Sequence, residues 1–138
     1  MRREPHPVRR ILVVDASVVV DLVGRFRPEP IEALLWAKDT LLATPELMQI
    51  EALQALRRLD EAGAIPRDRR SICELLRALP IRRYRHDSLL AGIWSLRANL
   101  SAYDAAYVTL ARTLRATLVT RDLKLAGAPG LDVPVKVP

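Results

Sequence analysis

Four acidic residues, far apart along the chain, have positions at which their side chains could work together: Asp15, Glu51, Asp104 and Asp122. Asp15 directly follows the apolar run ILVV, and Asp122 follows TLVT after one Arg. Both are therefore predicted at the carboxyl ends of buried strands. Asp104 falls in the first turn of a helix that begins after Ser101, and Glu51 falls inside a helix that follows the second predicted strand. These four carboxylates could converge on one edge of a sheet.

Clustered carboxylates repel one another, and a divalent cation removes that conflict. Ligands that offer only oxygen atoms suit Mg²⁺ or Mn²⁺. Such a cation can activate a water molecule and stabilise charge on a phosphodiester, and a pair of ions about 4 Å apart can do both. The residue types therefore indicate metal-assisted phosphodiester hydrolysis.

Each of the four acids also has a purely structural interpretation. Asp15 and Asp122 could cap the helices that follow them, because Asp often does so at strand-to-helix turns. Asp104 lies three residues after Ser101, which fits a capping box. Glu51 could be a solvated residue at the edge of an apolar helix face. Taken singly, no acid decides between structure and chemistry.

The overall charge favours an anionic partner. The chain of 138 residues holds 22 Lys and Arg against 16 Asp and Glu, giving a net charge of +6 and a pI near 10.2. A basic balance of this kind is often found in proteins that bind nucleic acid. The basic residues are mostly Arg, and they would hold a nucleic-acid backbone around an acidic centre. An acidic pocket within a basic surface is the charge arrangement of a metal-dependent nuclease.

Several other classes are excluded by what the sequence lacks. It has no apolar run as long as the ~20 residues of a membrane span, and no cleavage site follows its basic start, so we expect a cytoplasmic protein without membrane contact. It contains no C-x-x-C, no P-loop and no G-x-G-x-x-G motif. Neither His6 nor His86 has metal-ligand spacing, and the single Cys73, predicted as a core thiol, excludes an internal disulfide.

The acids must be positioned by alternating strands and helices. Residues 1–10, with four Arg and two Pro, are predicted to be a flexible basic arm, and residues 11–138 a single domain. Strands are predicted over residues 11–15, 41–44, 81–84, 117–120 and, as a last candidate, 133–137. A turn is predicted at residues 15–17, followed by a helix up to residue 24. Further helices are predicted over residues 30–38, 45–61, 66–79, 87–100, 103–115 and, as a short turn, 122–126.

Two helices carry specific expectations. Thr44 is predicted as an N-cap with Pro45 at the first helical position, so that the helix carrying Glu51 begins there. In the helix over residues 87–100, four residues are predicted on the apolar side: Leu90, Ile93, Trp94 and Leu96. Short apolar strands separated by helices indicate an α/β fold with three layers, α/β/α, around a central, mostly parallel sheet. In such folds the site lies beyond the carboxyl ends of the strands.

Four segments together resemble the PIN-domain ribonucleases, and in particular the VapC-type toxins of bacterial toxin–antitoxin pairs. They are VVDASVVVDL, PELMQIEALQALRRL, LSAYDAAYVTLA and LVTRD, and they occur in the order typical of that family. No segment alone is specific, since the first could open several α/β folds. The resemblance runs from about residue 11 to residue 137 and implies a PIN-like fold.

The resemblance implies roles for particular residues. Asp15, Glu51, Asp104 and Asp122 match the family's catalytic metal ligands. Ser17 and Thr120 match small hydroxyl residues that support such a site.

Two further residues are candidate phosphate contacts, Arg97 and Arg121. Arg97 could instead pair with a carboxylate on the same surface, and that structural interpretation is favoured. Because the aromatic content is only 4%, sequence readout by base stacking is not expected.

The resemblance further implies an endoribonuclease that depends on Mg²⁺ or Mn²⁺ and cuts single-stranded RNA. It implies a homodimer and a small cognate antitoxin as partners. Two alternatives stay open from the residues alone. One is an RNA-processing PIN nuclease outside a toxin–antitoxin system, and the other is a non-catalytic PIN-like module that binds RNA or protein.

Overall fold

A parallel sheet lies at the centre of the computed structural model, which describes residues 9–65 and 71–138. Within these residues five strands pair in the order β3-β2-β1-β4-β5, and every pair is parallel. The strands are β1 (Arg10–Val14), β2 (Thr40–Pro45), β3 (Arg82–Tyr84), β4 (Thr117–Val119) and β5 (Val135–Lys136). The first strand of the chain, β1, therefore lies in the middle of the sheet, between β2 and β4.

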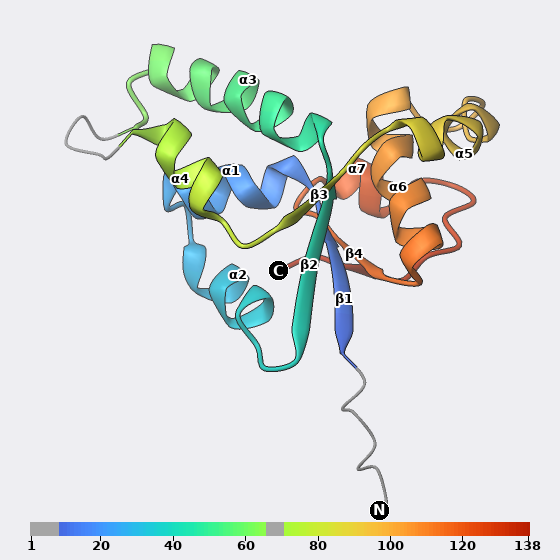
Figure 1. Cartoon of the computed structure of the whole chain (residues 1–138). Coiled ribbons are helices and arrows are strands. Elements are labelled where there is room, and N and C mark those ends of the chain that lie inside the picture. The colour runs from blue at the N-terminus through green and yellow to red at the C-terminus, as the bar shows by residue number, and fades with distance from the viewer. Residues whose placement is uncertain (1–8, 66–70) are drawn as a thin grey trace, which may run out of the picture.

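Helices cover both faces of this sheet. They are α1 (Ala16–Gly24), α2 (Pro28–Leu35), α3 (Leu47–Glu61), α4 (Ile72–Ala78), α5 (Leu90–Ser95), α6 (Ala102–Leu114) and α7 (Leu123–Ala126), with a 3₁₀ turn, η1 (Asp87–Leu89), before α5. Figure 1 shows α1 to α4 on one side of the strands and α5 and α6 on the other. The α/β fold with three layers, α/β/α, is confirmed.

The core explains why the strands are so apolar. Leu12, Val13 and Val14 of β1 are almost completely buried because helices pack on both faces of the central strand. Helix α6 packs against β1, β2 and β4, and its residues from Ala105 to Ala111 are buried apart from a trace of exposure. The chain next to the carboxyl ends of these strands is thus held on a rigid base.

The start of α3 differs from the prediction. Strand β2 runs through Pro45, and the helix begins at Leu47. The Thr44 hydroxyl does not cap the helix, because it is buried and donates to the Val14 carbonyl at 2.9 Å. The Leu47 backbone N–H instead donates to Nε2 of His86 at 3.0 Å. A side chain from the far end of β3 thus caps the helix, which no local pattern could indicate.

The predicted helix over residues 87–100 is also wrong in extent. It consists of η1, the six-residue α5 and turns up to Ser101. Leu90 and Trp94 are exposed rather than on a buried face. Ile93 and Leu96 are partly buried against the core, and the short helix contacts α6, so only part of the predicted apolar side is packed.

The remaining differences are smaller. Helix α2 begins at Pro28 instead of residue 30, and Cys73 is exposed rather than a core thiol. Arg10 belongs to β1, whereas residues 1–8 of the predicted arm and residues 66–70 of the predicted fourth helix lie outside the described residues. Among the helices of the described residues, none is long and apolar enough to cross a membrane.

Candidate active site at the carboxyl ends of the strands

One pocket brings together the four acids that the sequence singled out. Asp15 follows β1, Asp122 follows β4, Asp104 lies in the first turn of α6, and Glu51 lies in α3. All four line a pocket of about 430 Å³ at the carboxyl edge of the sheet, as the position of the strand ends predicted. A pocket of this size holds several waters at about 30 Å³ each. It therefore has room for a hydrated cation and part of a substrate.

Two hydroxyl groups fix one oxygen of Asp15. Its Oδ2 accepts hydrogen bonds from Ser17 Oγ at 2.6 Å and from Thr120 Oγ1 at 2.9 Å. The Ser17 oxygen in turn accepts from the backbone N–H of Arg121 at 3.0 Å, and the Thr120 oxygen accepts from that of Asp122 at 3.0 Å. The structure therefore brings Ser17 and Thr120 to the acid centre. Their hydroxyls tie the end of β1 to the segment that carries Asp122.

A buried tyrosine, Tyr107, orients Glu51. The Tyr107 hydroxyl donates to Glu51 Oε1 at 2.7 Å, and the backbone of Ala16 also hydrogen-bonds to this phenol. Burial above all, and then the negative charges of Asp15 and Glu51, raise the pKa of Tyr107, so it remains a proton donor. Tyr107 thus links α6 to α3 and to the residue after Asp15.

Sequence reasoning did not identify this role for Tyr107. The available signal was its position three residues after Asp104, since residues at that spacing share one face of a helix.

Electrostatic repulsion between neighbouring acids contributes to the raised pKa values of Glu51 and Asp104. Burial raises the pKa of Glu51; the hydrogen bond from Tyr107 lowers it in part, and the charges of Asp15 and Asp104 raise it further. Burial also raises the pKa of Asp104, as do the charges of Asp15 and Asp122, against a lowering by the Ser101 hydrogen bond. Among the ion pairs of the described residues, none places an Arg or Lys on any of these four carboxylates. Arg121 also lines the pocket, but its guanidinium pairs with Asp21, so within the described residues the four acids have no ion pair of their own.

The donor set fits a hard divalent cation that keeps part of its water. Oxygen-only ligands are those that Mg²⁺ and Mn²⁺ prefer. Across residues 9–65 and 71–138, no three acidic, His or Cys side chains are arranged to close on a single ion. A cation bound here would therefore be held by one or two of these carboxylates and keep several waters, as Mg²⁺ usually does.

The capping interpretations of Asp15 and Asp122 are correct as well, whereas Glu51 is half-buried and bonded to Tyr107 rather than solvated. Asp15 caps α1 by accepting from the Ser17 N–H, and Asp122 Oδ1 caps α7 by accepting from the N–H groups of Lys124 and Leu125 at 2.9 and 3.3 Å. Ser101 Oγ accepts from the Asp104 N–H at 3.2 Å. Capping leaves the second oxygen of Asp122 available, so a cap and a metal ligand are compatible roles for one carboxylate.

Arg121 has a different position from the one expected of a phosphate contact. Its guanidinium donates to Asp21 Oδ2 at 2.8 Å, to the carbonyls of Phe26 and Arg27 at 3.0 Å each, and to that of Pro138 at 3.1 Å. The side chain is only 9% exposed. The structure therefore gives this arginine protein partners inside the fold. Asp21, which also lines the pocket, was not among the predicted site residues.

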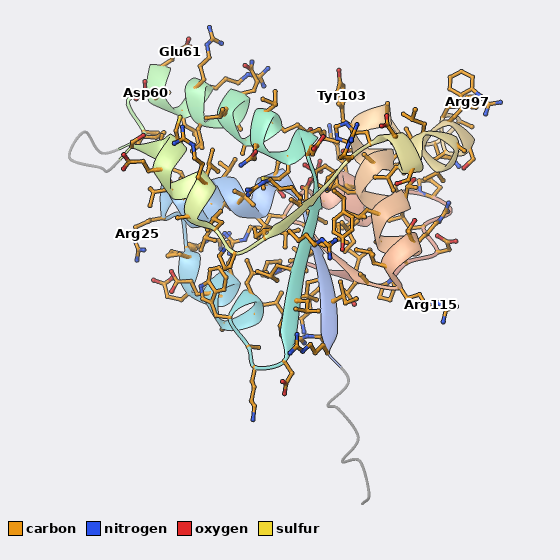
Figure 2. All side chains as sticks on the ribbon, viewed as in Figure 1. Arg25, Asp60, Glu61, Arg97, Tyr103 and Arg115 are labelled. Atoms are coloured by element: carbon orange, nitrogen blue, oxygen red, sulfur yellow. The ribbon has the colours of Figure 1, made fainter. Side chains whose placement is uncertain are left out.

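Arg97 does not line the pocket. It donates to the Trp94 carbonyl at 3.0 Å, and its guanidinium carbon lies 4.7 Å from the centre of the Trp94 ring. Figure 2 shows Arg97 at the outer end of α5, pointing away from the rest of the molecule. Within the described residues it forms no ion pair with a carboxylate. It packs on an exposed ring instead.

Comparison with known proteins places this architecture among characterised relatives. The family model described as PIN domain matches residues 12–131. Ribonuclease VapC3 of Mycobacterium tuberculosis is 38% identical over 129 residues, which cover 93% of this chain and 94% of VapC3. Ribonuclease VapC9 of the same organism is 38% identical over 130 residues, covering 92% of this chain and 98% of VapC9.

Solved structures share the fold at lower sequence identity. VapBC2 from Rickettsia felis, bound to a DNA fragment from its promoter, matches with a TM-score of 0.67 and 13% identity, covering 93% of this chain and 98% of that one. VapC20 of Mycobacterium tuberculosis, a toxin that cleaves the sarcin-ricin loop, matches with a TM-score of 0.62 and 17% identity, covering 85% and 95%. A toxin–antitoxin complex from Klebsiella pneumoniae matches with a TM-score of 0.59 and 17% identity, covering 91% and 95%.

Proposed function

We propose, from the premise that this chain belongs to the PIN domain family, that it is a metal-dependent endoribonuclease and the toxin of a toxin–antitoxin pair. The observation that carries the proposal is the pocket of four carboxylates, in which neighbouring acids raise the pKa of Glu51 and Asp104 and no Arg or Lys of the described residues forms an ion pair with them. Its relatives VapC3 and VapC9 are named ribonucleases. The four acids thus lie together in one pocket, where a metal-dependent ribonuclease would need negative charge to hold its ion.

Each acid has a distinct task in this proposal. A bound Mg²⁺ or Mn²⁺ would supply a Lewis acid for the phosphodiester and lower the pKa of a bound water. One or two of Asp15, Asp104 and Asp122 would bind the ion directly and the others through its waters, and the two hydroxyls on Asp15 Oδ2 hold that carboxylate in place at the pocket. Glu51, half-buried and oriented by Tyr107, is placed to bind the ion or to accept the proton of the attacking water.

The proposal includes two partners. One is RNA, whose phosphates the metal-loaded pocket and the exposed arginines would attract. The other is a cognate antitoxin, because several solved structures with this fold are toxin–antitoxin pairs. A homodimer is part of the same proposal and follows from the family resemblance.

Cleavage of RNA by the purified chain tests the activity. Wild type should cut single-stranded RNA with Mg²⁺ or Mn²⁺ and stop when the metal is chelated. Asp15→Asn should lower the rate at least 100-fold, because it removes the charge on the most buried ligand, and it should retain the fold by circular dichroism. Asp60→Asn is the matched control, since Asp60 is exposed at the far end of α3 (Figure 2).

Two outcomes would overturn parts of the proposal. If Asp15→Asn cleaves RNA like the parent, the site assignment is wrong. If Mn²⁺ gives no heat on titration and Asp104→Asn changes nothing, the chain is a non-catalytic binding module. Expression that leaves growth unaffected, despite RNA cleavage in vitro, would favour a processing nuclease over a toxin.

A further inference from the structure

We propose that the Tyr103 ring is a stacking platform for one base of the single-stranded RNA cut at the acid pocket. This inference rests on the proposed function and adds a contact that neither the acids nor the fold supplies. Single-stranded RNA commonly stacks its bases on aromatic side chains, because every base has a π-face. The low aromatic content argued against such contacts, but one ring in the right place is enough for one base.

The exposed rings differ in what surrounds them. Three aromatic side chains are exposed among the residues that the structure describes: Trp36, Trp94 and Tyr103. Trp36 follows α2 and precedes β2, so it lies toward the amino ends of the strands, away from the acids. Trp94 has Arg97 over one face of its ring. Tyr103 is 65% exposed, and within the described residues no ring or cation contact covers it.

Tyr103 is held next to the site. It directly precedes Asp104 in the first turn of α6, where Ser101 caps the helix. The turns that follow are packed into the core, so the base of this side chain is fixed. Figure 2 shows the Tyr103 side chain projecting beyond the ribbon at the end of the molecule where α3 and α6 begin. An exposed ring on a firmly packed helix thus lies one residue from a carboxylate that is proposed to hold the metal.

Exposed apolar side chains also flank two of the other acids. Ile50 directly precedes Glu51 and is 70% exposed, and Leu123 directly follows Asp122 and is 73% exposed. Apolar surface around a charged pocket suits a nucleotide chain, because its phosphates need the metal while its base faces are apolar. Of these side chains, only Tyr103 offers a flat aromatic face, so it is the one we assign to a base.

Cleavage of a single-stranded RNA pool randomised around the cut, in Mn²⁺, tests this assignment. The best-cut sequence is then remade with one abasic nucleotide at each position flanking the cut. Tyr103→Ala should lower kcat/KM by about 5- to 100-fold, the range for losing one base stack, whereas Tyr103→Phe should stay within about twofold. One abasic position should cost wild type the same factor and cost Tyr103→Ala nothing further. Trp36→Ala is the matched control and should cut like the parent.

Other results overturn the inference. Equal kcat/KM for wild type and Tyr103→Ala, or losses that add for every abasic position, removes the ring from base recognition while leaving the nuclease intact. A change of oligomeric state in Tyr103→Ala, measured by analytical ultracentrifugation, would assign the ring to a contact between copies of the chain. RNA that wild type never cuts overturns the proposed function and the inference together.

Discussion

The acid pocket and the Arg121 network are neighbours that treat buried charge in opposite ways. Arg121 is nearly buried, yet its guanidinium has an ion pair with Asp21 and three carbonyl acceptors. The four acids next to it repel one another and have no cationic partner among the described residues. Charge that the protein balances itself serves the fold, and charge that it leaves unbalanced is available for a ligand.

The two regions are also physically joined. The backbone N–H of Arg121 donates to the Ser17 hydroxyl that fixes Asp15, while its side chain holds the segment after α1. Asp21, on α1, lines the acid pocket and also forms the ion pair with Arg121. The ion pair of Arg121 and Asp21 thus forms one wall of the acid pocket. Substitutions in the ion pair and in the acids can therefore be compared directly.

The largest effect on stability is expected when the ion pair of Arg121 and Asp21 is broken. Arg121→Met should lower the free energy of unfolding by about 3 kcal/mol, because it strands the partly buried Asp21 carboxylate and three carbonyls. Urea unfolding monitored by circular dichroism measures this change. Adding Asp21→Asn to Arg121→Met should recover part of the loss, since no uncompensated charge remains; a double variant less stable than Arg121→Met would contradict this explanation.

The next largest effect on stability is expected when a cation neutralises the negative charge of the acid pocket. Mn²⁺ at about 100 times its Kd should raise the free energy of unfolding by about 2.7 kcal/mol, because it binds only the folded chain. Thermal unfolding with and without Mn²⁺ measures it. Asp104→Asn should shrink this gain and Asp60→Asn should retain it. An equal gain in the Asp104 variant would place the ion elsewhere.

A smaller effect removes the hydrogen bond by which Tyr107 orients Glu51. Tyr107→Phe should cost about 1 kcal/mol of stability, the worth of one hydrogen bond, since the ring still fills its place in the core. Its cleavage rate should fall about tenfold, because Glu51 loses the donor that orients it. In a Glu51→Gln background the same change should cost little further rate. Independent, multiplying losses would mean that Tyr107 supports only the fold.

The smallest effect is the pH dependence of the repulsion. The pKa of Asp104 is raised in the folded state, so the folded chain binds more protons than the unfolded one between the ordinary and the raised value. The stability of the metal-free protein should therefore fall as pH rises through that window.

Replacing Asp104 with Asn removes this penalty. Metal-free Asp104→Asn should exceed the parent in stability at pH 7 by less than about 1 kcal/mol, since solvent screens a half-exposed carboxyl. The difference should shrink as pH falls and disappear below the ordinary pKa of about 3.8, as urea unfolding at a series of pH values would show. A gap that does not change with pH would exclude repulsion at Asp104 as its cause.

Local sequence patterns were sufficient to predict the strands, the start of α6 and the parallel sheet of this protein. The apolar run before Asp15 predicted a buried strand with a carboxylate at its end, and Ser101 predicted the cap that starts α6. Both depend on neighbours within a few residues, which a single sequence displays. For the same reason the parallel sheet covered by helices could be predicted from strands that are apolar on both faces.

Contacts between distant segments were decided by tertiary structure alone. Ser17 and Thr120 meet because β4 pairs with β1 in parallel, and Tyr107 reaches Glu51 because α6 and α3 both begin at the carboxyl edge of the sheet. The exposed Trp94, the His86 cap of α3 and the internal partners of Arg121 have the same origin.

The sequence by itself thus determined which residues could do chemistry, because residue type and local periodicity are written in it. Only the packed fold decided which charges are balanced, since partners dozens of residues apart are chosen by strand order and helix packing.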